Sequence, residues 1–198
     1  MPEPPILLAS TSPQRRAILA KLGLPFDVVA PDYEEHDPPD ADPVWLVRSH
    51  AQGKARSVAA SADGRPVLGV DTTVVANGRV HGKAADAADA HAMLAGLAGR
   101  THEVHSGLCL LGPGFEDVEH EVTRVTFRPL LPAEIAAYVA TGEWEGRAGA
   151  YAIQGRGVAL VESIEGDYEN VVGLPVALLV RLLARRFPGA YGYGAPSA

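Results

Sequence analysis

Short apolar runs alternate with amphipathic segments along the first part of the chain. The runs at 6–9, 26–29 and 66–70 are bounded by proline, glycine or polar residues, so each predicts a strand. The segments from 13 to 22 and from 42 to about 60 place apolar residues at helical spacing. This alternation of strands and helices predicts an α/β fold with an elongated mixed sheet, helices on both faces and a central cleft.

The ends of the first two helices carry clear signals. Ser12 is a good N-cap and is followed by Pro13, whose fixed backbone angle suits the first helical position. Asp42 and the proline after it repeat the same signal. Gly23 is expected to end the first of these helices.

The rest of the chain adds further strands and helices. Asn77-Gly78 is typical of a tight hairpin turn, and Gly112-Pro113-Gly114 predicts a second turn. The periodicity predicts strands at 74–76, 79–81, 102–111, 118–127 and 157–162, helices at 86–97, 132–141 and 175–187, and a frayed tail at 188–198.

Composition places the chain among folded proteins. It has 198 residues, of which 47% are apolar and 21% charged, so disordered and fibrous classes are excluded. The length suits one domain over 1–198, with two lobes around one cleft. Because the first residues lack a signal-peptide pattern and no run of about 18 apolar residues occurs, we expect neither export nor membrane insertion.

Charge and cysteine content indicate which partners to exclude and which cellular compartment to expect. A net charge of −7 argues against a nucleic-acid partner, because such proteins usually carry a basic face. The single cysteine, Cys109, lies in an apolar run and cannot form an internal disulfide. A cytoplasmic location is therefore expected.

One segment has the features of an anion site. Ser10, Thr11 and Ser12 follow the first strand, and Arg15 and Arg16 fall in the first turn of the next helix. Backbone N–H groups at a helix N-terminus attract phosphate, and positive side chains there are otherwise unfavourable. A phosphate cradle and a well-capped helix with two exposed arginines explain these residues about equally well.

The acidic candidates each have two interpretations. Asp71 follows the strand at 66–70, and ligands usually bind at the carboxyl ends of strands in α/β sheets. It can hold a divalent metal or accept a proton from water, or it is a turn residue that binds the backbone. Asp32, Glu34 and Glu35 can coordinate magnesium or are solvated loop charges.

The remaining candidates are weaker when taken singly. Lys54 and Lys83 are more often surface residues than ligands. The segment Gly78–Ala84 is not a P-loop, because three residues rather than four separate its glycines. His102 and His105 are expected to be solvent or edge histidines rather than zinc ligands.

Taken together, the motifs resemble those of one family over nearly the whole chain. The matching blocks are Ile6 to Arg16, Leu22 to Phe26, Gly69 to Thr72, Gly82-Lys83, Leu97 to His102, Ala148 to Gly155 and Asn170 to Pro175. They are similar to the signature blocks of the Maf family, also called septum-formation inhibitor proteins.

The resemblance implies an intracellular nucleoside triphosphate pyrophosphatase that releases a nucleoside monophosphate and pyrophosphate. It implies a fold like that of inosine triphosphatases, a divalent metal cofactor (Mg²⁺ or Mn²⁺), a homodimer and a role in house-cleaning of nucleotides. Carried over by position, Asp71 is the catalytic proton acceptor and a metal ligand, and Glu35 is associated with the metal. The phosphate-binding positions are Ser10, Ser12, Arg15, Arg16, Lys54 and Lys83.

Three positions in the family that the chain resembles are associated with the choice of nucleobase. The subgroup acting on dTTP and UTP typically has arginine after the Ser-Pro pair, threonine after the catalytic aspartate and glutamine in the Ala-Tyr-Gly-Ile-Gln block. A second subgroup, acting on 7-methyl-GTP, has tryptophan, glutamine and glutamate there. Thr72 and Gln154 match the first subgroup, whereas Gln14 matches neither. We therefore expect pyrimidine triphosphates as substrates, with CTP or modified nucleotides also accepted.

Two other functions remain open at this point. A nucleotide-binding regulator of septum formation would bind the same ligands with weak catalysis. A phosphatase or nucleotidyltransferase would share the phosphate cradle, but the chain lacks a recognisable nucleophile motif.

Overall fold

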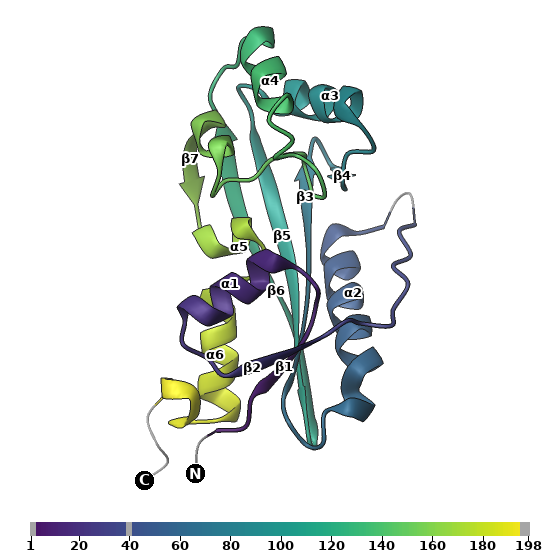
Figure 1. Cartoon of the computed structure of the whole chain (residues 1–198), viewed down its shortest axis with the longest axis vertical. Coiled ribbons are helices and arrows are strands. Elements are labelled where there is room, and N and C mark those ends of the chain that lie inside the picture. Colours follow the sequence, from purple (N-terminus) through teal and green to yellow (C-terminus); the bar gives the residue numbers. More distant parts are fainter. Residues whose placement is uncertain (1–2, 39–40, 195–198) are drawn as a thin grey trace. The chain divides into compact units, whose positions relative to one another are not determined.

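The computed structural model describes residues 3–38 and 41–194 of the chain (Figure 1). Within these ranges the strands are β1 (Ile6–Ala9), β2 (Phe26–Val29), β3 (Val67–Ala76), β4 (Arg79–His81), β5 (Thr101–Gly112), β6 (Phe115–Phe127) and β7 (Val161–Glu165). The α-helices are α1 (Pro13–Lys21), α2 (Pro43–Val58), α3 (Ala87–Leu97), α4 (Pro132–Val139), α5 (Tyr168–Val172) and α6 (Val176–Arg186). Three short 3₁₀ helices are η1 (Ala59–Ser61), η2 (Arg156–Leu160) and η3 (Ala190–Gly192).

The strands form one mixed sheet in the order β2-β1-β3-β5-β6-β7, with β4 paired to β3. β1 runs parallel to both β2 and β3, whereas β4 is antiparallel to β3 and β7 is antiparallel to β6. The mixed α/β class is therefore confirmed. None of the helices in the described ranges is long and apolar enough to cross a membrane.

The chain forms two compact units. Among the described residues, the first unit comprises 3–38, 41–71, 106–121 and 173–194, and the second comprises 72–105 and 122–172. β3, β5 and β6 each contribute residues to both units. The division of β3 falls between Asp71 and Thr72.

Helices cover both faces of the strands in the first unit. Arg56 on α2 binds Glu116 through two hydrogen bonds of 2.6 Å. Arg186 on α6 binds the next residue of β6, Asp117, at 2.5 and 2.6 Å. Because successive side chains of a strand point to opposite faces, α2 and α6 lie on opposite faces of the sheet, as Figure 1 also shows.

Two glycines allow α2 to approach the sheet closely. A Cβ atom on Gly69 of β3 would lie 2.1 Å from the carbonyl oxygen of Ala51, and one on Gly107 of β5 would lie 2.0 Å from that of Val47. The backbone of α2 therefore rests directly on these strands. This contact puts Lys54, one turn further along α2, within reach of Asp71 on β3.

The second unit has its own hydrophobic core. α3 and α4 pack against the second-unit part of the sheet. The largest buried side chains of this core include Leu94, Leu97, Phe127 and Ile153.

The region around 157–162 differs from the expected strand. Residues up to Leu160 form η2 and the strand begins only at Val161. The prediction was wrong because the apolar run is not buried as a strand would be: Val158 is 59% exposed. Gly157 instead packs against backbone, since a Cβ there would lie 2.5 Å from the carbonyl oxygen of Ala152. The short helix α5 was not expected.

Asp71 is not at the carboxyl end of a strand. β3 continues without interruption from Val67 to Ala76, so Asp71 lies in its interior and is neither at a strand end nor in a turn. A carboxylate is tolerated at this buried position because Lys54 neutralises it.

The C-terminal tail contains local structure. In the stretch expected to be frayed, residues 190–192 form η3 and the Tyr191 hydroxyl donates a hydrogen bond to the carbonyl oxygen of Pro4 at 2.8 Å. The last four residues of that stretch, 195–198, lie outside the described ranges.

Candidate active site

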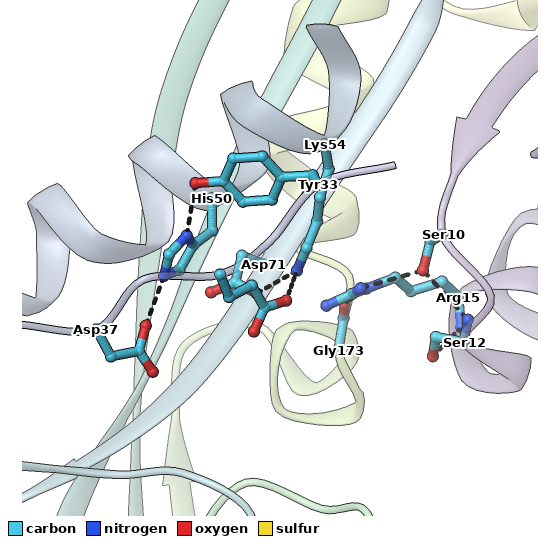
Figure 2. A network of polar contacts seen from close by, with 10 residues as sticks. Ser10, Ser12, Arg15, Tyr33, Asp37, His50, Lys54, Asp71 and Gly173 are labelled. Atoms are coloured by element: carbon cyan, nitrogen blue, oxygen red, sulfur yellow. Dashed lines mark hydrogen bonds and ion pairs between the residues drawn. The ribbon is translucent and has the colours of Figure 1, made fainter. Parts of the chain in front are cut away.

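The N-terminus of α1 forms one side of the candidate site (Figure 2). Ser12 caps the helix by accepting a hydrogen bond from the Arg15 backbone N–H at 3.5 Å, which confirms the predicted cap. The Oγ atom of Ser10, which is buried, accepts from the Ser12 backbone N–H at 3.2 Å. The two serines thus shape the turn between β1 and α1.

Arg15 is held in place by its neighbours. Its Nε donates to the carbonyl oxygen of Gly173 at 2.9 Å and its Nη1 donates to Ser10 Oγ at 3.2 Å. Burial lowers the pKa of Arg15, while the charges of Asp71 and Glu35 raise it. Because arginine stays protonated in proteins, this is a fixed cation close to two carboxylates.

The other candidates on α1 lie differently. Gln14 accepts a hydrogen bond at Oε1 from the Ser12 hydroxyl at 3.1 Å, which orients its amide group. Arg16 is exposed. The alternative of two exposed arginines is therefore wrong for Arg15.

Lys54 joins the two acidic candidates. Its Nζ lies 2.6 Å from Asp71 Oδ1 and 2.6 Å from Glu35 Oε1. The Lys54 and Asp71 side chains are only 10% and 13% exposed, whereas that of Glu35 is 46% exposed. A buried ion pair is thus linked to a carboxylate at the surface, and all three residues converge on one point.

This acidic pair suits a divalent metal in part. Mg²⁺ is usually bound through one or two carboxylates together with water and substrate phosphates. Glu35 and Asp71 offer two carboxylates, whose Oε1 and Oδ1 atoms both contact Lys54 Nζ, and no third histidine, cysteine, aspartate or glutamate completes a metal-binding group among the residues described. The donor set fits a metal that is shared with a phosphate ligand.

Sequence reasoning missed a second set of contacts beside this pair. Tyr33 and Asp37 flank Glu35, and both contact the buried His50 of α2: the Tyr33 hydroxyl lies 2.9 Å from Nδ1 and Asp37 Oδ1 lies 2.7 Å from Nε2 (Figure 2). Burial raises the pKa of Tyr33, and the nearby carboxylates add to the effect. The available signal was the four-residue spacing between His50 and Lys54, which places both on one face of a helix.

The remaining candidates belong to the second unit. Thr72 is the residue of β3 that follows Asp71, and Lys83 is exposed and forms an isolated bridge with Ala148. Gln154 is exposed in the turn before η2. Nearby in the sequence, the buried Tyr151 forms a hydrogen bond of 2.9 Å with His102 Nε2.

The histidines His102 and His105 are both buried, so the expectation of solvent or edge histidines was wrong. Burial, with a smaller contribution from His81, lowers the pKa of His102 to about 4 from an ordinary value of 6.5. Between these two values the unfolded chain binds a proton that the folded chain does not, so stability falls as the pH falls.

Replacing His102 tests this effect. At pH 4.5 the buried imidazole should lower the free energy of unfolding by about 2–3 kcal/mol relative to pH 7. In His102→Gln this contribution should be absent, so the urea midpoint should change less between the two pH values than in the unmodified protein. Equal changes in both proteins would contradict the prediction.

Comparisons with known proteins agree on one family. A model of the family described as "Maf-like protein" matches residues 5–186. A protein from Nitratidesulfovibrio vulgaris named dTTP/UTP pyrophosphatase is 50% identical over 184 residues, which are 92% of this chain and 88% of that protein. A protein of the same name from Moorella thermoacetica is 51% identical over 181 residues, covering 90% and 93% of the two chains.

One solved structure, the Staphylococcus aureus Ham1 protein, matches 63% of this chain and 72% of that one. Its TM-score is 0.44 and its sequence is 15% identical.

Proposed function

This chain belongs to the Maf family, and from that premise we propose that it is a nucleoside triphosphate pyrophosphatase acting on pyrimidine nucleotides. It hydrolyses the bond between the α- and β-phosphates and releases a nucleoside monophosphate and pyrophosphate. The observation that carries the proposal is the contact of Lys54 with both buried Asp71 and Glu35, close to the cationic Arg15. The relatives named dTTP/UTP pyrophosphatase support the choice of nucleotide.

Asp71 acts as the proton acceptor in this proposal. Water attacks phosphorus, a new P–O bond forms, the bridging P–O bond breaks, and the proton of the water passes to the Asp71 carboxylate. Lys54 holds this carboxylate in position through its 2.6 Å contact. Attack on phosphorus is favoured when fixed cations stabilise the negative charge that develops on the phosphate oxygens.

The cations have separate assignments. Arg15 and Lys54 bind phosphate oxygens, together with the Ser10 and Ser12 hydroxyls and the exposed Arg16. Lys83 is proposed to bind phosphate as well. Held cations of this kind form strong, charge-assisted hydrogen bonds with phosphate.

A divalent metal, Mg²⁺ or Mn²⁺, completes the proposal. Glu35 and Asp71 are the residues that would hold it, since they are the two carboxylates beside the proposed phosphate-binding cations; the point between their Oε1 and Oδ1 atoms is itself occupied by Lys54 Nζ. When bound, such an ion neutralises phosphate charge during the displacement.

The products of the reaction test the proposal. We would incubate the protein with UTP, dTTP, CTP, GTP and 7-methyl-GTP in the presence of Mg²⁺ or Mn²⁺ and separate the products. Monophosphate and pyrophosphate in equal amounts, with UTP and dTTP preferred, are expected. Diphosphate and orthophosphate would identify a phosphatase instead, and binding without turnover would indicate a regulator.

Gln14 is proposed to broaden the choice of base, which Thr72 and Gln154 otherwise direct toward pyrimidines. A glutamine amide both donates and accepts hydrogen bonds, whereas arginine only donates. Gln14→Arg should therefore shift selectivity away from CTP and toward UTP and dTTP by about 5- to 150-fold in kcat/KM. The measurement is kcat/KM for the three nucleotides with both proteins, and unchanged ratios would refute the role of Gln14.

The proposal also covers assembly and location. We expect a homodimer without a nucleic-acid partner, formed from a single Maf-like domain. The buried thiol of Cys109 is compatible with the reducing cytoplasm that we propose as its compartment.

A further inference from the structure

The loop that carries Glu35 is held to α2 by the side chain of His50, which contacts one residue before Glu35 and one after it. We propose that His50 is a positioning residue: its two ring nitrogens bind Tyr33 and Asp37, and thereby hold Glu35 in contact with Lys54. The inference rests on the proposed function, because it assigns His50 a part in preparing the acidic pair for the metal and phosphate.

The hydrogen-bond chemistry of His50 is defined by its partners. The Asp37 carboxylate only accepts hydrogen bonds, so Nε2 carries the proton and donates to Oδ1 at 2.7 Å. When Nε2 alone carries a proton, Nδ1 is an acceptor, and the Tyr33 hydroxyl donates to it at 2.9 Å. Since His50 is only 3% exposed, water does not readily replace either partner.

The ring of Tyr33 is seated on the helix backbone. A Cβ atom at Gly53 would lie 2.1 Å from Tyr33 Cε2, so only a glycine leaves room for the ring at this point. Tyr33 therefore has two contacts with α2: its ring lies over Gly53 and its hydroxyl binds His50.

Glu35 lies two residues from each anchor. Its carboxylate is 46% exposed, and surface ion pairs by themselves do little to order a side chain. The ion-pair partner Lys54 lies one helical turn after His50 on the same helix. The anchors and the partner of Glu35 are thus fixed to one rigid element, which sets the distance between Glu35 and Asp71.

A purely stabilising role is a poor explanation of these contacts. The Asp37 side chain is 64% exposed, and a contact with so exposed a carboxylate contributes little to stability. Together with the Tyr33 contact, the contact between His50 and Asp37 determines the path of residues 33–37. Ligand-orienting partners of this kind typically change metal affinity or activity by about 10- to 100-fold when they are removed.

Two variants remove the anchors in different ways. His50→Leu deletes both hydrogen bonds at once, whereas Tyr33→Phe combined with Asp37→Ala deletes them from the other side and keeps the buried histidine. Arg48→Leu is the matched control, because it removes a hydrogen bond from α2 to the Val118 carbonyl oxygen that does not involve the loop. The proposal predicts the same behaviour for the first two variants and no change for the control.

The position of the loop can be measured without turnover. A glutamyl endopeptidase must accommodate several residues around its cleavage site in an extended form, so it should cleave after Glu34 or Glu35 faster when this segment is released from α2. Cleavage at these sites, followed by mass spectrometry, should be about 10-fold or more faster in both anchor variants than in the control. Equal cleavage in all of these proteins would overturn the proposal.

Metal binding and kinetics give the second measurement. Mn²⁺ binding, followed by electron paramagnetic resonance with a UTP analogue whose α and β phosphates are joined by methylene, should weaken by about 10- to 100-fold in both anchor variants. At saturating Mn²⁺, the kcat for UTP should fall while KM changes by less than about 2-fold. Faster cleavage with unchanged Mn²⁺ binding and unchanged kcat would overturn the positioning role.

The two failures can be told apart. If the unmodified protein releases no monophosphate and pyrophosphate from any nucleotide, the proposed function fails. If it does release them, and the anchor variants match Arg48→Leu in metal binding and kcat, only the inference about His50 fails.

Discussion

Asp71→Asn should lower kcat by about 10²- to 10⁴-fold, because the amide retains the shape of the side chain but cannot accept the proton of the attacking water. The fold should survive this change. The asparagine oxygen can still accept a hydrogen bond from Lys54, and Glu35 remains as a counter-ion for the ammonium group.

Two measurements separate catalysis from structure in this variant. Pyrophosphate release gives kcat and KM, and a thermal denaturation curve gives Tm. We expect a large loss of kcat with little change in Tm. A variant that is active but has a much lower Tm would show that Asp71 serves the strand and not the reaction.

Lys54→Met should lower both the stability of the protein and its kcat. The methionine preserves most of the buried stem but removes the ammonium group, so Asp71 loses its hydrogen-bond donor in a nearly buried position. A buried acceptor left without its partner costs about 1–3 kcal/mol of stability. The loss of one preorganised cation should also lower kcat by about 10²- to 10³-fold.

The control for Lys54→Met is Arg56→Met on the same helix. Arg56 forms an exposed ion pair with Glu116, and such pairs contribute about 0–1 kcal/mol. Lys54→Met should lower Tm by roughly 2–12 °C, and Arg56→Met should leave both Tm and kcat near their original values. If the two variants lose the same amount of activity, the role assigned to Lys54 is wrong.

The elements with strong local signals were predicted closely. β1 and β2 have the predicted bounds, and α1 begins at Pro13 after the Ser12 cap. The hairpin at Asn77-Gly78 is also confirmed, with both residues at positive φ. These features depend on neighbouring residues only, so the sequence contains the information that determines them.

Features that depend on distant residues were predicted less well. The continuity of β3 through Asp71 requires a cation from α2, 17 residues away. The run at 157–162 has strand-like composition, but its residues up to Leu160 form the 3₁₀ helix η2 because Gly157 packs on the backbone of Ala152. In both cases a tertiary contact overrides the local pattern.

The candidate site was predicted in part. The sequence pattern and the resemblance together indicated Arg15, Glu35, Lys54 and Asp71, and the first unit brings these residues close together. Tyr33, Asp37 and His50 were not indicated. The spacing of His50 and Lys54 places both on one face of α2, but no spacing rule relates a tyrosine or aspartate in a loop to a histidine in the next helix.

The contact of α2 with the sheet through Gly69 and Gly107 restricts how this protein can be engineered. Even an alanine at either position would force the helix outward, and Lys54 would move with it. Libraries that aim at new nucleotide selectivity should therefore leave these two codons unchanged and diversify Gln14, which lies in the first turn of α1. Variants found in such a library would differ in nucleotide recognition, whereas the position of Lys54 beside Asp71 would be retained.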